Sequence, residues 1–171
     1  HAAARGIPNF HIFGEVATGD YDPALLASWT RNAAFPAVLD FAFMRAAVDA
    51  ASGKSGTDLL ARLTDDDALY EGGKAAALQL PTFLGNHDAG RFAYFLREAK
   101  PAMSPQEELA RMMLGHAMLL TLRGVPTIYS GDEQGFVSDG NDQDAREDMF
   151  ASKVASYNDN RLLGTSKTTA T

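Results

Sequence analysis

The chain has 171 residues, of which 46% are hydrophobic and 22% charged, and this is typical of one globular domain with a substantial core. Its formal net charge of −7 argues against nucleic acid as a partner, because binding to phosphates needs a basic face. The absence of cysteine excludes disulfides and thiolate zinc sites, and no apolar run approaches the roughly 20 residues of a membrane span.

The predicted elements alternate between strands and helices. Asp22 before Pro23 indicates a capped helix start, and Ser104, Pro105 and Glu107 form a capping box in which Glu107 is placed to reach back. In chain order we expect a strand at 9–16, a helix from Pro23, a strand at 36–43, a helix at 44–52, a short helix within 56–70, a strand at 78–85, a long helix from 105 to Gly124, a strand at 124–131 and one helical turn near 150–157.

The predicted strands are continuous apolar runs, which is typical of a parallel sheet covered by helices. Polar residues follow these runs directly: Glu15 after the first, His87 and Asp88 after the third, and Asp132 with Glu133 after the fourth. In α/β folds, ligands bind at the carboxyl ends of the strands. We therefore expect a site where these residues meet.

Glu15 and Asp88 are the leading candidates for chemistry, because two carboxylates across a cleft can serve as acid and base, or as acid and nucleophile, on an acetal. Glu15 follows Phe13 and Gly14, so we expect apolar walls around it. The alternative is a purely structural role, in which Glu15 caps the next helix or makes a salt bridge, and the sequence favours neither role over the other. His87 lies between Asn86 and Asp88, and this polar cluster favours a site over a loop histidine without ligand contact.

Other polar residues have simpler interpretations. Asp40 lies inside a predicted strand, so it needs a partner if buried, and structural support is its expected role. His11 and His116 lie in apolar segments and are expected to be core or interface histidines. Asp132 and Glu133 compete with Glu15 as acids, but a turn before Gly135 explains them equally well.

The acidic segment 138–148 invites a calcium-loop interpretation. The EF-hand pattern needs glycine at its sixth position, where Asp144 stands, so the pattern fails. We expect a loop that touches sugar, or plain surface.

Several segments together resemble the alpha-amylase family of glycoside hydrolases. "FHIFGEV" and "TFLGNHDAGRF" resemble two signature segments, "RGVPTIYSGDEQGF" resembles the last barrel strand, and "DGNDQDAREDMF" resembles the loop after it. "FPAVLDFAF" stands where the family has its sixth strand. The resemblance covers about 7–150, with 151–171 as the tail of the same domain. It implies an α/β fold: a partial TIM (β/α)8 barrel, with parallel strands five to eight and their covering helices.

The resemblance assigns roles residue by residue. Glu15 matches the general acid/base, and Asp88 matches the transition-state stabiliser that grips sugar hydroxyls. His87 matches the histidine that helps to bind the same ring, and Arg146 matches an arginine of the later loop that we expect to contact substrate. No cofactor is implied; calcium is expected only in a parent protein, because its usual site is not in this chain.

The departures from the family pattern concern the missing first half. The family's aspartate nucleophile lies in an Arg-x-Asp segment before the GEV segment, and no such segment precedes Glu15 here. We therefore expect this chain to be a fragment of a retaining enzyme that hydrolyses α-glucosidic bonds in starch, maltodextrin or related sugars, and to be inactive alone. The alternatives are a family transglycosylase or trehalose-forming isomerase, and a non-catalytic interaction protein on the same barrel.

A half barrel leaves two strand edges and one apolar face uncovered. We expect these to favour a homodimer or swapped assembly. The other expected partner is an oligosaccharide or polysaccharide, with no nucleic acid. Location is undetermined, with secretion favoured over the cytoplasm because many family members that digest polymers are secreted.

Overall fold

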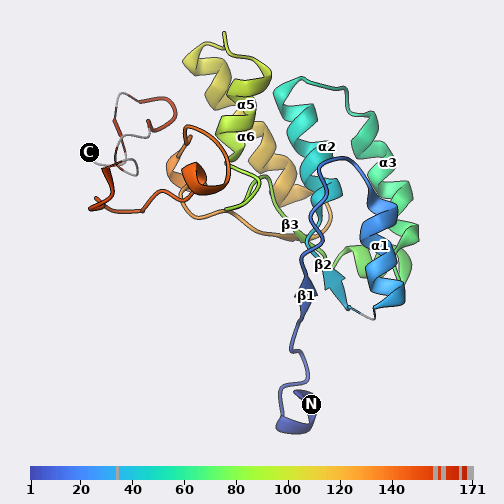
Figure 1. Cartoon of the computed structure of the whole chain (residues 1–171). Helices are drawn as coiled ribbons and strands as arrows, with labels where there is room; N and C mark the ends of the chain where they lie inside the picture. The colour runs from blue at the N-terminus through green and yellow to red at the C-terminus, as the bar shows by residue number, and fades with distance from the viewer. Residues whose placement is uncertain (34, 156–157, 159–160, 166, 169–171) are drawn as a thin grey trace.

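The computed structural model describes residues 1–33, 35–155, 158, 161–165 and 167–168 of the chain. Short strands alternate with helices along it (Figure 1). The described strands are β1 (Phe13–Gly14), β2 (Ala37–Val38), β3 (Pro81–Thr82) and β4 (Val125–Pro126); the α-helices are α1 (Pro23–Asn32), α2 (Phe41–Ser52), α3 (Asp58–Asp66), α4 (Gly73–Ala77), α5 (Phe92–Ala99) and α6 (Pro105–Thr121); the 3-10 turns are η1 (Ala3–Arg5), η2 (Asp67–Leu69), η3 (Asp132–Gln134) and η4 (Asp142–Ala145).

The strands form two parallel pairs, β1 with β2 and β3 with β4. A backbone hydrogen bond of 2.9 Å, from the Asp40 N–H to the Pro81 carbonyl, joins the two pairs. The predicted parallel order is therefore confirmed, as an arc that does not close. Each strand is shorter than predicted, and proline contributes to this in β3 and β4, because Pro81 and Pro126 have no N–H to donate to a ladder.

Asp40 corrects the predicted strand at 36–43. Its Oδ1 accepts a 2.8 Å hydrogen bond from the Phe43 N–H, so Asp40 is the N-cap of α2, and the helix begins at Phe41 rather than Met44. The carboxylate is fully buried and is paired with Arg123, which also bonds Asp67. The expected partner therefore exists, and its role is to tie β2 to the segment before β4.

Helix α5 was not predicted, although Phe92, Ala93 and Leu96 give it one buried face. The side chain of its N-cap, Arg91, makes no capping hydrogen bond, so the usual start signal is absent. The long helix α6 does begin at the predicted cap, where the Ser104 hydroxyl accepts a 3.2 Å bond from the Glu107 N–H. The Glu107 carboxylate instead binds Lys100 and Arg111. The turn expected near 150–157 lies partly outside the described residues.

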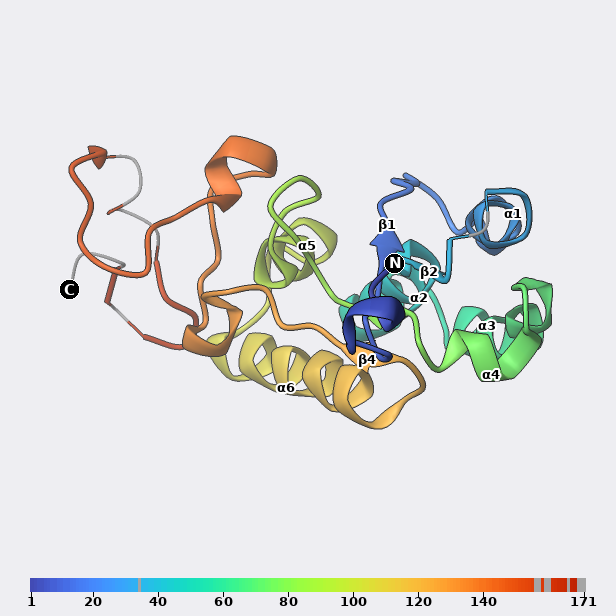
Figure 2. The same cartoon turned by 90° about the horizontal axis from the view of Figure 1, so that it is seen from below.

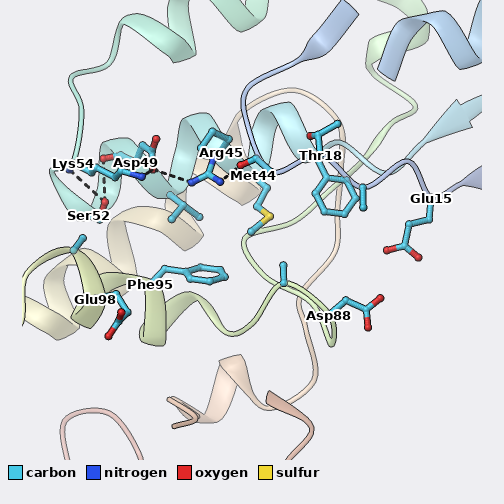
Figure 3. Close-up of a pocket in the computed structure, with 16 residues that line it drawn as sticks. Glu15, Thr18, Met44, Arg45, Asp49, Ser52, Lys54, Asp88, Phe95 and Glu98 are labelled. Atoms are coloured by element: carbon cyan, nitrogen blue, oxygen red, sulfur yellow. Dashed lines mark hydrogen bonds and ion pairs between the residues drawn. The ribbon is translucent and has the colours of Figure 1, made fainter. Parts of the chain in front are cut away.

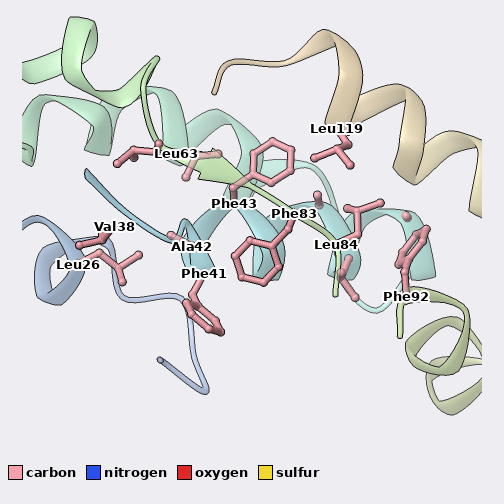
Figure 4. Packing of buried hydrophobic residues seen from close by; sticks show 14 of the residues in the cluster. Leu26, Val38, Phe41, Ala42, Phe43, Leu63, Phe83, Leu84, Phe92 and Leu119 are labelled. Carbon is pink, nitrogen blue, oxygen red and sulfur yellow. The ribbon is translucent and has the colours of Figure 1, made fainter. Parts of the chain in front are cut away.

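The hydrophobic core surrounds α2 and the strand segments beside it (Figure 4). The rings of Phe41 and Phe83 meet edge to face with centroids 5.0 Å apart. Gly115 of α6 packs on Phe92, since a Cβ at Gly115 would lie 2.3 Å from the Phe92 ring. These contacts hold the segments that follow β2 and β3 against α2 and α6. None of the described helices is long and apolar enough to cross a membrane.

The edges of the arc are open within the described part of the chain, because β1 and β4 each pair on one side only. Large apolar side chains at or beside them are exposed, among them Phe13 of β1, Val125 of β4 and Ile128 just after β4. Association through these edges stays a prediction. Light scattering coupled to size exclusion should report a mass of two chains or more, and a monomer at high concentration would contradict it.

Candidate active site

Two carboxylates reach one cavity from the ends of two strands, as expected. Glu15 follows β1, Asp88 lies in the loop after β3, and both line a cavity of about 570 Å³ (Figure 3). Both residues are exposed, so the apolar enclosure expected around Glu15 is absent from the described structure. An open cleft of this kind admits a bulky polar ligand to both carboxylates.

The loop that carries Asp88 is held by its own asparagine. Asn86 Oδ1 accepts hydrogen bonds from the backbone N–H groups of Asp88 (3.0 Å) and Ala89 (2.6 Å). The backbones of Asn86 and Gly90 also pair in both directions. A Cβ at Gly85 would lie 2.4 Å from the Gly90 carbonyl oxygen, so this crossing needs glycine. The turn leaves His87 and Asp88 pointing outward.

Three of the four predicted site residues meet at the Asp88 carboxylate. Arg146 Nη2 donates to Asp88 Oδ1 at 2.8 Å, and His87 Nε2 lies 3.4 Å from the same oxygen. Arg146 also donates to Asp142 Oδ1 at 2.7 Å. Asp142 was not predicted, although its spacing of four residues from Arg146 was a usable signal. Glu15 approaches this cluster only across the cavity.

A buried arginine behind the site was missed by the sequence analysis. Arg91 is 1% exposed and donates to Glu147 Oε2 at 2.5 Å, to Asp132 Oδ1 at 2.8 Å and to the Ser130 carbonyl at 3.0 Å. Its guanidinium also stacks over the Tyr129 ring, 4.4 Å from the centroid. Arg91 thus joins the loop after β3 to the segment after β4.

This arginine connects to the site through sequence neighbours. Glu147 directly follows Arg146, so the bond from Arg91 holds the backbone from which Arg146 reaches Asp88. Tyr129 adds a second tie, because its hydroxyl donates to the Ala145 carbonyl at 2.8 Å. The exposed Asp88–Arg146 pair is therefore held in place by the buried contacts of Arg91 and Tyr129.

Asp132 and Glu133 do not line the cavity that holds Glu15. Asp132 is buried against Arg91, and Glu133 accepts a 2.9 Å bond from the Gly131 N–H in the turn before Gly135. The turn interpretation therefore accounts for both. Burial raises the pKa of Asp132 to about 6, and the neighbouring Arg91 only partly offsets this.

The raised pKa of Asp132 predicts a pH-dependent stability. The Asp132 carboxyl holds its proton more tightly in the folded protein than in the unfolded chain. Its protonation therefore contributes fully to the free energy of unfolding below pH 4, and this contribution is lost as the pH rises through 6. A shift of two units corresponds to about 3 kcal/mol. The unfolding free energy of the wild type, minus that of Asp132→Asn, should fall by up to this amount between pH 4 and pH 7.

Urea unfolding at several pH values measures this difference. Asp139→Asn, which alters an exposed carboxylate of the same region, should give a curve parallel to the wild type. A wild-type minus Asp132→Asn difference that stays flat or rises with pH would overturn the assignment.

The remaining histidines have separate places. His116 is half-buried on α6, where Nδ1 lies 3.0 Å from the Met112 carbonyl oxygen and the ring meets Phe92 edge to face, in line with a core position. His11 is exposed beside Phe13, so the core alternative is wrong for it, while the interface alternative stays a prediction. Within the described ranges, no group of three or more acidic or histidine side chains is placed to hold a metal ion.

Known proteins are similar to this chain in sequence and in arrangement. Residues 1–163 match the family described as alpha-amylase, catalytic domain. The chain is 41% identical over 170 residues to an alpha-amylase of Streptomyces lividans, covering 99% of this chain and 18% of that protein. A 68-residue stretch, 40% of this chain, is 41% identical to a cyclomaltodextrin glucanotransferase of Bacillus sp. (strain 1-1), of which it covers 8%.

The fold comparison agrees with the sequence comparison. A solved alpha-amylase from Anoxybacillus superposes with a TM-score of 0.68 at 26% identity, over 85% of this chain and 29% of that chain. The chain therefore spans less than a third of the length of these relatives. The likeness accounts for the open arc of strands as a portion of a TIM barrel.

Proposed function

This chain belongs to the alpha-amylase family of glycoside hydrolases, and from that membership we propose that it supplies one side of the catalytic cleft of an enzyme that hydrolyses α-glucosidic bonds in starch, maltodextrin or related glucans. The observation that carries the proposal is the pair of carboxylates, Glu15 and Asp88, at one cavity. Because the chain covers 18% of its Streptomyces relative, the activity belongs to the complete protein.

In the proposed mechanism, Glu15 acts as the general acid. It gives its proton to the glycosidic oxygen as the bond to the anomeric carbon breaks, and later takes a proton from the attacking water. Asp88 stabilises the positive charge that develops on the sugar ring and accepts hydrogen bonds from its hydroxyls. His87 and Arg146 orient the same ring, because both are in contact with Asp88.

The covalent step needs an aspartate nucleophile that we place outside these 171 residues, in the family's Arg-x-Asp segment. No such segment precedes Glu15 in the printed sequence. We therefore propose that the isolated chain turns over little or no substrate, since loss of a nucleophile costs several powers of ten in rate. Turnover by the isolated chain that disappears in Glu15→Gln would mean that another carboxylate here replaces it.

The products formed by the complete protein test this function. With maltoheptaose, proton NMR should show shorter maltooligosaccharides whose new reducing ends are first in the α-configuration, because a covalent intermediate gives retention. Products that begin in the β-configuration, or an intact substrate, would contradict the proposal.

A transferase is the second candidate, favoured by the local match to the cyclomaltodextrin glucanotransferase. Both reactions pass through the same glycosyl-enzyme and differ in whether water or a sugar hydroxyl accepts it. Products longer than maltoheptaose, or cyclic products, would identify the transferase. A non-catalytic protein would bind the glucan and leave it intact.

A further inference from the structure

The cavity that begins at Glu15 and Asp88 continues well away from them. In Figure 3 these carboxylates lie at one end, and Ser52 and Lys54 lie at the other. Between the two ends the cavity runs between α2 and α5. At about 570 Å³ it falls within the roughly 300–1,000 Å³ of pockets that enclose small ligands. The α2–α5 arm is defined here by its lining residues Arg45, Asp49, Ser52, Lys54, Phe95 and Glu98.

One wall of the α2–α5 arm is apolar and aromatic. Met44 of α2 lies on one side, and the ring of Phe95 on α5 lies opposite it (Figure 3). Val48 of α2 also lines the cavity. Phe95 is only half-buried, so some of its ring is open to a ligand. The ring also packs on the loop of Asp88, because a Cβ at Gly90 would lie 3.1 Å from it. An aromatic face of this kind suits the C–H face of a sugar ring.

The polar residues of the arm balance in charge. Arg45 and Lys54 are cationic, while Asp49 and Glu98 are anionic. Asp49 Oδ1 lies 3.7 Å from Arg45 and 3.8 Å from Lys54. An ionic ligand would meet like charge as well as opposite charge here, whereas hydroxyl groups can donate to carboxylates and accept from the cations.

An unpaired hydroxyl points to the same kind of ligand. Thr18 lines the cavity, and its Oγ1 is buried without a hydrogen-bond partner among the described residues. A buried hydroxyl without a partner costs free energy, so a ligand hydroxyl that pairs with it would be favoured. A neutral, polyhydroxylated ligand satisfies this group as well as the charged ones.

We propose that the α2–α5 arm is a binding subsite for glucosyl units of a neutral glucan, which holds the substrate beyond the Glu15–Asp88 pair. The identity of the sugar rests on the proposed function, while the location rests on Phe95 and the balanced charges; Thr18 lines the same cavity nearer to Glu15 (Figure 3). The arm would favour substrates long enough to reach from the reacting bond to Phe95.

Direct binding of maltotriose to the 171-residue chain, followed by isothermal titration calorimetry, tests the subsite without any turnover. Phe95→Ala and Phe95→Leu should each weaken binding by about tenfold, because both lack the flat aromatic face. Phe95→Leu keeps apolar volume against Gly90, so it separates loss of the sugar contact from loss of packing. Trp29→Leu is the matched control, since it removes a partly exposed aromatic ring of α1 that does not line the cavity.

Each outcome decides one way. Weakened binding in Phe95→Leu with normal binding in Trp29→Leu supports the subsite. Unchanged binding in both Phe95 variants, no binding by the wild type, or tighter binding of glucose 1-phosphate than of maltotriose would overturn it. If maltotriose binding depends on Phe95 but the complete protein cleaves no glucan, the proposed function fails while the subsite stands; the reverse result removes the subsite alone.

Discussion

In the complete protein, Glu15→Gln is expected to lower kcat on maltoheptaose by about three orders of magnitude, within the range that a general acid contributes. The substitution keeps the size of the side chain and its place after β1, but glutamine has no proton of suitable acidity for the leaving oxygen. The substrate contacts that we propose for Asp88, His87 and Arg146 are not altered by this substitution, so KM should change far less than kcat.

The dependence on the leaving group identifies the role of Glu15. A nitrophenyl maltooside has a leaving group that needs little protonation, so Glu15→Gln should lose much less rate on it than on maltoheptaose. Asp20→Asn is the control, because Asp20 is an exposed carboxylate of the same loop that does not line the cavity. An equal loss on both substrates, or an unchanged rate on maltoheptaose, would contradict the assignment.

Arg91→Met is expected to lower the free energy of unfolding by about 3–5 kcal/mol, as is typical when one partner of a buried ion pair is removed. Methionine fills much of the space, but Asp132 and Glu147 would remain buried without their cation. The Ser130 carbonyl would also lose its hydrogen bond from Arg91. Urea denaturation followed by circular dichroism measures the change.

A comparison with the neighbouring exposed pair sharpens this test. Arg146→Met breaks the contacts with Asp88 and Asp142, whose side chains are more than half exposed, and should cost no more than about 1 kcal/mol. Adding Glu147→Gln and Asp132→Asn to Arg91→Met should restore some of the stability, since no buried charge would then be unpaired. If Arg91→Met and Arg146→Met lowered the free energy of unfolding equally, burial would not determine the contribution of these ion pairs.

Arg91→Met should also loosen the segment that carries Arg146, and this should affect the candidate site. Arg91 holds the backbone beside Arg146, so its removal leaves the contact between Arg146 and Asp88 less well fixed. In Figure 2 the described residues from η4 to 155 lie on the far side of α5 from α1, α3 and α4. The contacts of Arg91 therefore anchor this segment to the helical body.

The residues adjacent to strands could be found from the sequence, because their positions depend on local pattern. An apolar run that ends in polar side chains marks the carboxyl end of a strand, and parallel order brings such ends together. This is why the sequence could place Glu15, His87 and Asp88 after strands, while their roles stay predictions. The cap at Ser104 and the start of α6 were found for the same reason, since the cap hydrogen bond spans three residues.

Tertiary structure alone decided which distant residues pair. Arg91 finds Asp132 and Glu147 at separations of 41 and 56 residues, and Arg123 finds Asp40 at 83, and no local pattern encodes such partners. Asp40 is a further example. The apolar run around it predicted a strand, but in the structure its carboxylate caps α2. Local chemistry therefore indicated where the candidate site lies, while long-range packing decided which residues hold it and how far its cavity extends.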